Sequence, residues 1–146
     1  MKAKTDVGIL KVVSAAINRH SKAYPSWQYT RFWDDLYHQV QTYLSNHGNL
    51  APKELPILVM FIDEATWTLV SSQAVRYANE GLSTYVLAKE IEAVQYGDFK
   101  GYLKQLEQVS IHSKSGLVHQ VVYETGNASI GFMYALQTLQ QLHYVS

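Results

Sequence analysis

The sequence contains no cysteine, so it can form no disulfide, no thiolate metal site and no cysteine nucleophile. A chain of this kind suits a reducing compartment, and we expect a cytoplasmic protein. The N-terminus begins with basic residues, but Gly8 and Lys11 interrupt the apolar stretch that follows. This pattern argues against a secretion signal.

Long hydrophobic runs and an excess of one charge are also missing. The best candidate for a membrane span, residues 57–62, is far shorter than the roughly 20 apolar residues that cross a bilayer. The 12 basic and 12 acidic residues give a formal net charge of zero, which removes the broad attraction that accompanies binding to nucleic acids or anionic membranes. We therefore expect neither a nucleic-acid partner nor a membrane partner.

The remaining composition is that of an ordinary globular protein. Of the 146 residues, 47% are hydrophobic and 16% are charged, which indicates neither disorder nor a fibrous repeat. At this length folding hides roughly two-thirds of the surface of the unfolded chain. The sequence predicts one compact unit with a single core.

The first 50 residues are predicted to be helical. Ile9, Val13 and Ile17 recur at helical spacing behind a cap at Thr5 or Asp6. After an interruption at residues 24–26, a second apolar stripe ends near Gly48 and consists of Trp33, Leu36, Tyr37, Val40, Tyr43 and Leu44. Residues 1–50 are therefore expected to form a helical hairpin, which packs on the rest of the chain because neither helix can bury its stripe alone.

Strand-like patterns begin after Pro52 and Pro56, which cannot continue a helix. Residues 57–62 are apolar throughout, as in a strand that is covered on both faces or closed into a barrel. At the end of the chain, Ser129 is expected to cap a helix that runs to about Leu142. The strands between are predicted at residues 57–62, 66–71, 74–77, 84–87, 91–96, 106–112 and 117–124. The fold class is therefore α+β.

Residues 55–146 resemble the pleckstrin-homology-like domains of many uncharacterised bacterial proteins. The likeness is carried by four segments: TWTLVSSQAVRYANEG at 66–81, YVLAKEIEAVQYGD at 85–98, GLVHQVVYE at 116–124 and IGFMYALQTLQQL at 130–142. The resemblance implies a strongly bent, seven-stranded antiparallel sheet or barrel, one open end of which is plugged by the C-terminal helix. A second α+β arrangement, with three helices on one face of an antiparallel sheet, uses the same elements.

The same resemblance raises the question of lipid binding. Membrane-targeting members of the pleckstrin-homology family hold lipid phosphates with basic residues in and beside the loop between the first two strands. In this chain that loop is Asp63, Glu64 and Ala65, and the nearest following basic residue is Arg76. Two carboxylates repel a polyphosphate, so we do not expect phosphoinositide binding.

No catalytic, cofactor-binding or metal-binding motif emerges from the sequence. His112 and His119 are close enough to be diagonal neighbours across a hairpin, but two ligands do not make a metal site. Neighbouring carboxylates are interpreted as solvated charges, namely Asp34 with Asp35, Asp63 with Glu64, and Glu90 with Glu92. We predict no catalytic residue, no metal and no cofactor, and hence a protein that is not an enzyme.

The richest local feature is an aromatic segment between the two N-terminal helices. It contains Tyr24, Trp27, Tyr29, Phe32, Trp33 and Tyr37, with Arg31 among them. Aromatic residues and arginine dominate protein interfaces when they are exposed, but they also fill cores. Helical spacing directs Phe32, Trp33 and Tyr37 toward the sheet, which leaves Trp27, Tyr29 and Arg31 as candidates for contact with another protein.

The sequence therefore favours an interaction or adaptor module. Its partner would bind the aromatic segment or an exposed sheet edge, and it would be another protein or a second copy of this chain. An immunity-type protein that neutralises a toxin is an alternative of the same class. A small-ligand carrier or an enzyme that uses a tyrosine-lined pocket between helices and sheet is the alternative of a different class.

Overall fold

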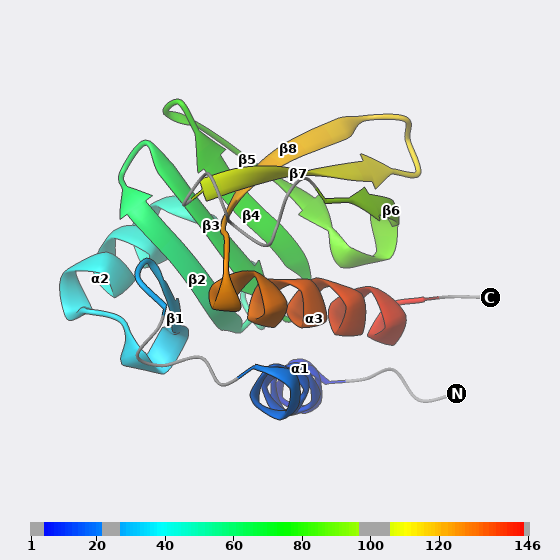
Figure 1. Cartoon of the computed structure of the whole chain (residues 1–146), viewed down its shortest axis with the longest axis horizontal. Helices are drawn as coiled ribbons and strands as arrows, with labels where there is room; N and C mark the ends of the chain where they lie inside the picture. Colours follow the sequence, from blue (N-terminus) through cyan, green and yellow to red (C-terminus); the bar gives the residue numbers. More distant parts are fainter. Residues whose placement is uncertain (1–4, 22–26, 97–105, 145–146) are drawn as a thin grey trace.

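A computed structural model describes residues 5–21, 27–96 and 106–144. These residues form three α-helices and two antiparallel sheets, one of five strands and one of three (Figure 1). The predicted α+β class is confirmed. Within the described residues, no helix is long and apolar enough to cross a membrane.

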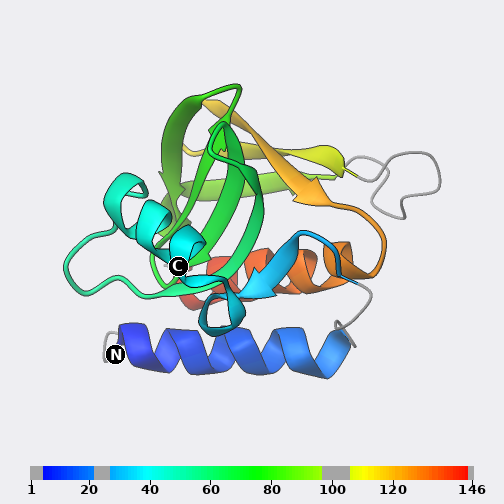
Figure 2. The same cartoon turned by 90° about the vertical axis from the view of Figure 1, so that its left-hand side faces the viewer.

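The first helix, α1 (Asp6–His20), begins as the sequence predicts. The side chain of Thr5 accepts a hydrogen bond from the backbone N–H of Gly8 at 3.0 Å, which satisfies one of the free donors at the helix start. The stripe of Ile9, Val13 and Ile17 is buried. This stripe packs against the last helix, α3 (Asn127–Leu142), so that α1 runs beneath α3 (Figure 2).

The helix α3 begins two residues before the predicted cap. Its N-cap position is Gly126, with φ of +75°, a backbone conformation that glycine adopts without strain. The hydroxyl of Ser129 donates to the carbonyl of Gly126 at 2.6 Å, so Ser129 is bonded inside the first turn and does not occupy the cap position. The prediction of the cap residue was wrong, whereas the end of the helix is correct.

The larger sheet is built from neighbouring antiparallel strands in the order of the sequence. Asp63 shapes the tight turn between the second and third strands, because its carboxylate accepts the N–H groups of Ala65 and Thr66 at 2.8 and 3.0 Å. The five strands are β1 (Thr30–Phe32), β2 (Pro56–Asp63), β3 (Thr66–Ser71), β4 (Ala74–Asn79) and β5 (Leu82–Leu87).

The smaller sheet follows a 3-10 turn at Ala88–Glu90 and consists of β6 (Ile91–Gln95), β7 (Leu106–Ser113) and β8 (Val118–Glu124). The predicted hairpin between β7 and β8 is confirmed, and its turn uses Gly116 at a φ of +94°. The two sheets contact each other through β8, and the hydroxyl of Thr68 in β3 donates to the carbonyl of Val122 in β8 at 2.5 Å.

All seven predicted strands occur, but the structure divides them between the two sheets. It also adds β1, which lies in a region that the sequence pattern assigned to the helical hairpin. This strand pairs with β2 in an antiparallel register that places Thr30 opposite Met60. The sheet consequently gains a strand that local propensity did not indicate.

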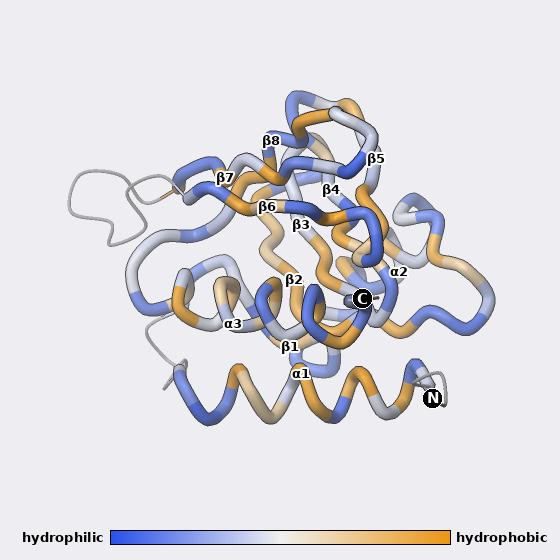
Figure 3. Tube along the Cα trace, turned by 90° about the vertical axis from the view of Figure 1, so that its right-hand side faces the viewer, coloured by the Kyte–Doolittle hydropathy of each residue, from blue (hydrophilic) through white to orange (hydrophobic). Residues whose placement is uncertain are grey.

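Two hydrophobic clusters cover the larger sheet on both faces. The main core lies between α1, α3 and the two sheets, and it includes Trp27. A smaller cluster lies on the opposite face, where α2 (His38–His47) buries Leu44 against Val59 and Trp67. The prediction that residues 57–62 are covered on both faces is thereby supported for β2. Figure 3 shows the hydropathy along the Cα trace of this strand.

The N-terminal helices do not pair as the sequence analysis expected. The helix α1 packs against α3, whereas α2 packs on the other face of the sheet (Figure 2). The cause is β1, because its pairing with β2 carries the chain past the sheet edge before α2 begins. The expected helical hairpin at residues 1–50 is thus replaced by two helices with different packing partners.

Candidate protein-interaction site

The described part of the aromatic segment enters the fold at Trp27, and this residue lies in the main core with 1% of its surface exposed. Tyr24 is outside the described residues. The indole of Trp27 fills the space beside Gly131 of α3, where a Cβ atom would lie only 2.9 Å from the Trp27 ring. Trp27 therefore stabilises the core and offers no surface to a partner in the folded chain, contrary to its expected role.

The two other candidates lie at the surface end of the same segment. Tyr29 and Arg31 are both half-buried. The guanidinium of Arg31 donates through Nη1 to the backbone carbonyls of Trp27 and Thr30 at 2.9 and 2.7 Å. These bonds hold the guanidinium against its own backbone, so the position of Arg31 is fixed by local structure.

A buried carboxylate holds the backbone of this segment in place. Glu124, at the end of β8, is 5% exposed. Its oxygens accept hydrogen bonds from the N–H groups of Gln28 and Tyr29 at 2.7 and 2.8 Å, and from the hydroxyl of Thr30 at 2.8 Å. Charge-assisted bonds of this kind are stronger than neutral ones, so the backbone from Gln28 to Thr30 is rigidly placed.

Beside this segment lies a groove of about 390 Å³, here called the Tyr37 groove. Tyr37 stands at its edge with 81% of its surface exposed. Apolar and aromatic residues share the lining with one arginine and one aspartate: Gln28, Tyr29, Arg31, Asp35, Leu36, Tyr37, Val40 and Phe61. The groove thus combines rigidly held backbone, exposed aromatic surface and both signs of charge.

The exposure of Tyr37 corrects the expectation that this residue faces the sheet. The 3-10 turn Trp33–Asp35 ends before α2 begins, and Leu36 and Tyr37 between them have extended backbone angles. The apolar spacing therefore does not continue as one helix. Trp33 packs against the smaller cluster as expected, whereas Tyr37 turns outward.

The histidines considered for a metal site lie apart. In the β7–β8 register, His112 is opposite Val118 and His119 is opposite Ile111. Because side chains alternate across a strand, the two histidines occupy opposite faces of the hairpin. His119 shares a hydrogen bond of 2.8 Å with the hydroxyl of Tyr77, and His112 bonds Gln95. Their arrangement does not bring two ligands together.

In the acidic turn between β2 and β3, the carboxylate of Asp63 already accepts two backbone N–H groups. Arg76, the nearest following basic residue, is engaged elsewhere. Arg76 is 6% exposed and forms a buried ion pair with Glu54, with its Nη2 2.6 Å from a carboxylate oxygen. The guanidinium of Arg76 is therefore held by Glu54 and not by Asp63 or Glu64. The expectation against phosphoinositide binding remains a prediction.

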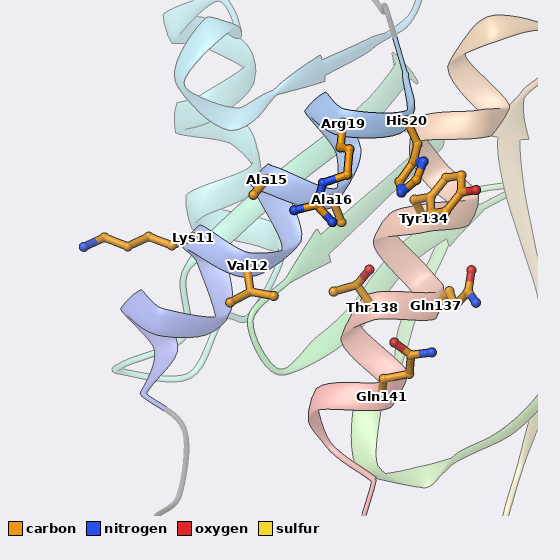
Figure 4. Close-up of a pocket in the computed structure, with 10 residues that line it drawn as sticks. All are labelled: Lys11, Val12, Ala15, Ala16, Arg19, His20, Tyr134, Gln137, Thr138 and Gln141. Carbon is orange, nitrogen blue, oxygen red and sulfur yellow. The ribbon is translucent and has the colours of Figure 1, made fainter.

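A second hollow, of about 500 Å³, lies between α1 and α3 (Figure 4). The ring of His20 stacks on Tyr134 with 3.9 Å between centroids. Lys11 points away from the hollow, whereas Thr138 and Gln141 line its α3 side. None of its lining residues is a carboxylate, so this hollow offers no acid and base pair.

The Tyr37 groove is therefore the feature that brings the predicted residues Tyr29 and Arg31 together. Sequence reasoning missed Leu36 and Phe61, which it assigned to a helix and to a strand core. Comparison of the chain with family models, with curated proteins and with solved structures finds no match in any of the three.

Proposed function

We propose that this chain is a non-catalytic protein-interaction module that binds its partner in the Tyr37 groove. The observation that carries the proposal is the exposure of Tyr37, 81% of whose surface is open beside Tyr29 and Arg31. Interfaces are enriched in tyrosine and arginine, and the energetically dominant residues cluster in pockets of this composition. Nothing in the fold covers Tyr37 within the described residues.

Rigid placement of the groove supports the same proposal. The three hydrogen bonds to Glu124 fix one wall, and α2 provides the other wall with Val40. A wall that is already ordered loses little conformational entropy on binding, which favours affinity. A partner that inserts an apolar side chain into the groove and places a charged group near Arg31 or Asp35 would match it.

The scaffold beneath the groove is proposed to be pleckstrin-homology-like. The order of seven strands, β2 to β8, followed by the helix α3 agrees with what the resemblance implies. Also in favour is the position of α3, which lies across one end of the two packed sheets (Figure 1). In this proposal β1, α1 and α2 are additions to the domain, and β1 with α2 forms the groove.

The proposal is tested by placing a photo-crosslinking amino acid at position 37 and capturing partners in native lysate. The matched control carries the same amino acid in place of Tyr144, another tyrosine with 73% of its surface exposed. We expect one specific adduct from position 37 and none from position 144. Competition by unlabelled wild type should remove the adduct, whereas an unlabelled Tyr37→Ala variant should not.

The identity of the adduct separates two kinds of partner. An adduct of twice the protein's own mass, together with a dimer in light scattering that Tyr37→Ala abolishes, identifies a second copy of the chain. A heterologous adduct identifies a separate protein partner. Equal labelling from both positions, or competition by Tyr37→Ala as strong as by wild type, would contradict the proposal.

A further inference from the structure

A small hollow of about 150 Å³ opens at the C-terminal end of α2, away from the Tyr37 groove. It lies between the end of this helix and the strands β4 and β5. Its lining is mostly polar and comprises His47, Gly48, Asn49, Trp67, Arg76, Ser83, Thr84 and Tyr85. This hollow, here called the Arg76 hollow, contains hydrogen-bonding groups that the fold itself does not use.

The first unused group belongs to Arg76. Its Nε and Nη2 atoms donate to the two oxygens of Glu54 at 2.8 and 2.6 Å, and its guanidinium lies 4.8 Å above the ring of Tyr85. These contacts hold the guanidinium in one orientation. The remaining nitrogen, Nη1, donates to no described residue, so two N–H donors are available at the hollow.

The second unused group is the indole N–H of Trp67. Trp67 is 1% exposed, and its Nε1 atom has no hydrogen-bond partner in the described part of the chain. Buried donors are almost always paired, and an unpaired donor requires an explanation. Trp67 also lines the Arg76 hollow, so its indole N–H signal can report on a ligand that Arg76 holds there.

The hollow also offers acceptors. The Nδ1 atom of His47 lies 2.9 Å from the carbonyl oxygen of Tyr43, and a carbonyl can only accept a hydrogen bond. In the neutral ring Nδ1 therefore carries the proton, and Nε2 is left as an acceptor. The hydroxyl of Ser83, which shares this face of the sheet with Arg76, can accept as well. Donors and acceptors together are complementary to a carboxamide, which has one carbonyl oxygen and an NH₂ group.

The charge of the site argues for a neutral ligand over an anion. The carboxylate of Glu54 already neutralises Arg76 at 2.6 Å. A second carboxylate or a phosphate at Nη1 would bring two negative groups onto one guanidinium in a poorly solvated place. A carboxamide uses the same donors without this repulsion.

The neighbouring edge of the sheet indicates how the carboxamide is delivered. The strand β5 is the last in its sheet, and Ala88 N–H donates to the carbonyl of Gln73 at 2.8 Å. Because hydrogen bonding alternates along an antiparallel pair without register shifts, Ser83, Tyr85 and Leu87 direct their N–H and C=O groups away from β4. Within the described residues no strand pairs with this edge, and an extended peptide can add to it.

We propose that the Arg76 hollow binds the side-chain carboxamide of an asparagine or glutamine carried by an extended peptide segment that pairs with the free edge of β5. The peptide backbone bonds Ser83 and Tyr85, and its carboxamide oxygen accepts from Arg76 Nη1. The carboxamide NH₂ group donates to His47 Nε2. This site is separate from the Tyr37 groove and does not depend on the function proposed for it.

Nuclear magnetic resonance provides a direct test, because each tryptophan gives its own indole N–H signal. The signal of Trp67 is assigned with Trp67→Phe and is followed while propionamide or propionate is added to the full-length protein. We expect propionamide to move the Trp67 signal and to leave those of Trp27 and Trp33 unchanged. Propionate should cause a smaller change at the same concentration. An unmoved Trp67 signal, or a larger effect of propionate, would overturn the proposal.

Two variants that each replace one histidine of α2 with phenylalanine locate the binding site. His47→Phe keeps the ring that stacks on Tyr43 at 4.2 Å but removes the acceptor. It should weaken the propionamide effect by about tenfold, as expected for loss of one good hydrogen bond. The control is His38→Phe at the other, exposed end of α2, which should bind propionamide as wild type does. Equal weakening by both variants would count against the site.

The strand-addition part is tested with short, blocked peptides of alternating threonine and valine that carry glutamine, glutamate or alanine at the centre. The glutamine peptide should shift the amide signals of Ser83, Tyr85 and Leu87 together with the Trp67 indole, and the alanine peptide should bind about tenfold more weakly. Shifts at other strand edges instead of β5, or a preference for the glutamate peptide, would overturn it. Concentration-dependent shifts of the β5 amides without peptide would instead identify a second copy of the chain as the occupant.

Discussion

The carboxylate of Glu124 accepts a hydrogen bond of 2.8 Å from the backbone N–H of Tyr29, although 95 positions separate the two residues in the sequence. The same carboxylate binds Gln28 and Thr30. It thus ties the start of the larger sheet to the last strand of the smaller one, and it fixes the wall of the Tyr37 groove.

Glu124→Gln should destabilise the protein, because an amide has one acceptor oxygen where the carboxylate has two, and a buried N–H loses its partner. We expect a loss of about 1–3 kcal/mol in the free energy of unfolding, measured by urea denaturation. Crosslinking from position 37 should also weaken. Glu92→Gln, at an exposed position of β6, is the control and should leave both quantities unchanged.

A second prediction concerns the contribution of the buried pair of Glu54 and Arg76 to the free energy of unfolding. Removal of one member leaves an uncompensated buried charge, so Arg76→Met should cost about 3–5 kcal/mol in the free energy of unfolding. The double variant Glu54→Leu/Arg76→Met should recover part of this loss, because neither charge then remains. Equal stability of the two variants in urea denaturation would contradict this view of the pair.

The same pair should make stability fall in acid. Burial raises the pKa of Glu54, but hydrogen bonds from Arg76, Ser71 and the N–H of Ala51 outweigh it and lower the pKa below its usual value of 4.5. The stabilisation is therefore present above pH 4.5 and is lost as the pH falls through the lower folded pKa. In denaturation series between neutral and acidic pH, Glu54→Gln should be less stable than wild type at neutral pH, and the difference should shrink in acid.

His119 should also make stability fall in acid, but for a different reason, namely that burial disfavours its charged form. Burial lowers the pKa of His119 below 6.5, so the folded protein binds this proton less readily than the unfolded chain does. Its contribution is present above pH 6.5 and is lost as the pH falls toward the lower folded pKa. Wild type should therefore lose more stability than His119→Gln on going from about pH 7.5 to about pH 5.5. Parallel losses in the two proteins would show that His119 is not responsible.

Gly131 should tolerate no side chain while Trp27 is present. A Cβ at position 131 would lie 2.9 and 3.1 Å from two carbons of the Trp27 ring. Overpacking of this kind costs about 1–3 kcal/mol and offsets the roughly 1 kcal/mol by which alanine favours a helix. Gly131→Ala should lower the melting temperature. In a Trp27→Phe background the same change should cost less, and an equal cost would refute the contact.

Sequence patterns predict those parts of the fold that depend on local spacing. The stripe of Ile9, Val13 and Ile17, the cap at Thr5 and the turn at Gly116 are each determined by a few neighbouring residues. The packing of α1 against α3 is not determined by neighbouring residues, because any amphipathic helix could bury its stripe on either face of the sheet. That choice depends on β1, a strand of three residues stabilised mainly by its pairing with β2.

The candidate site could be predicted only in part, because some of its features depend on residue type and others on contacts between distant residues. Tyr29 and Arg31 stand out by residue type alone, and both line the groove. The exposure of Tyr37 depends on an extended step between a 3-10 turn and α2, where neither glycine nor proline marks the break. The burial of Trp27 depends on a glycine more than 100 positions away, and the role of Glu124 depends on a contact across 95 positions.

The pairing of α1 with α3 also has a consequence for synthesis on the ribosome. The helix α1 buries its apolar stripe against α3, which is made more than 100 positions later, so Ile9, Val13 and Ile17 must remain without their final partner until α3 has emerged. Contacts so distant in sequence slow folding and leave apolar surface open to association. A chain that is released before α3 is complete would therefore expose this stripe, and cellular quality control would meet it as an unfolded protein.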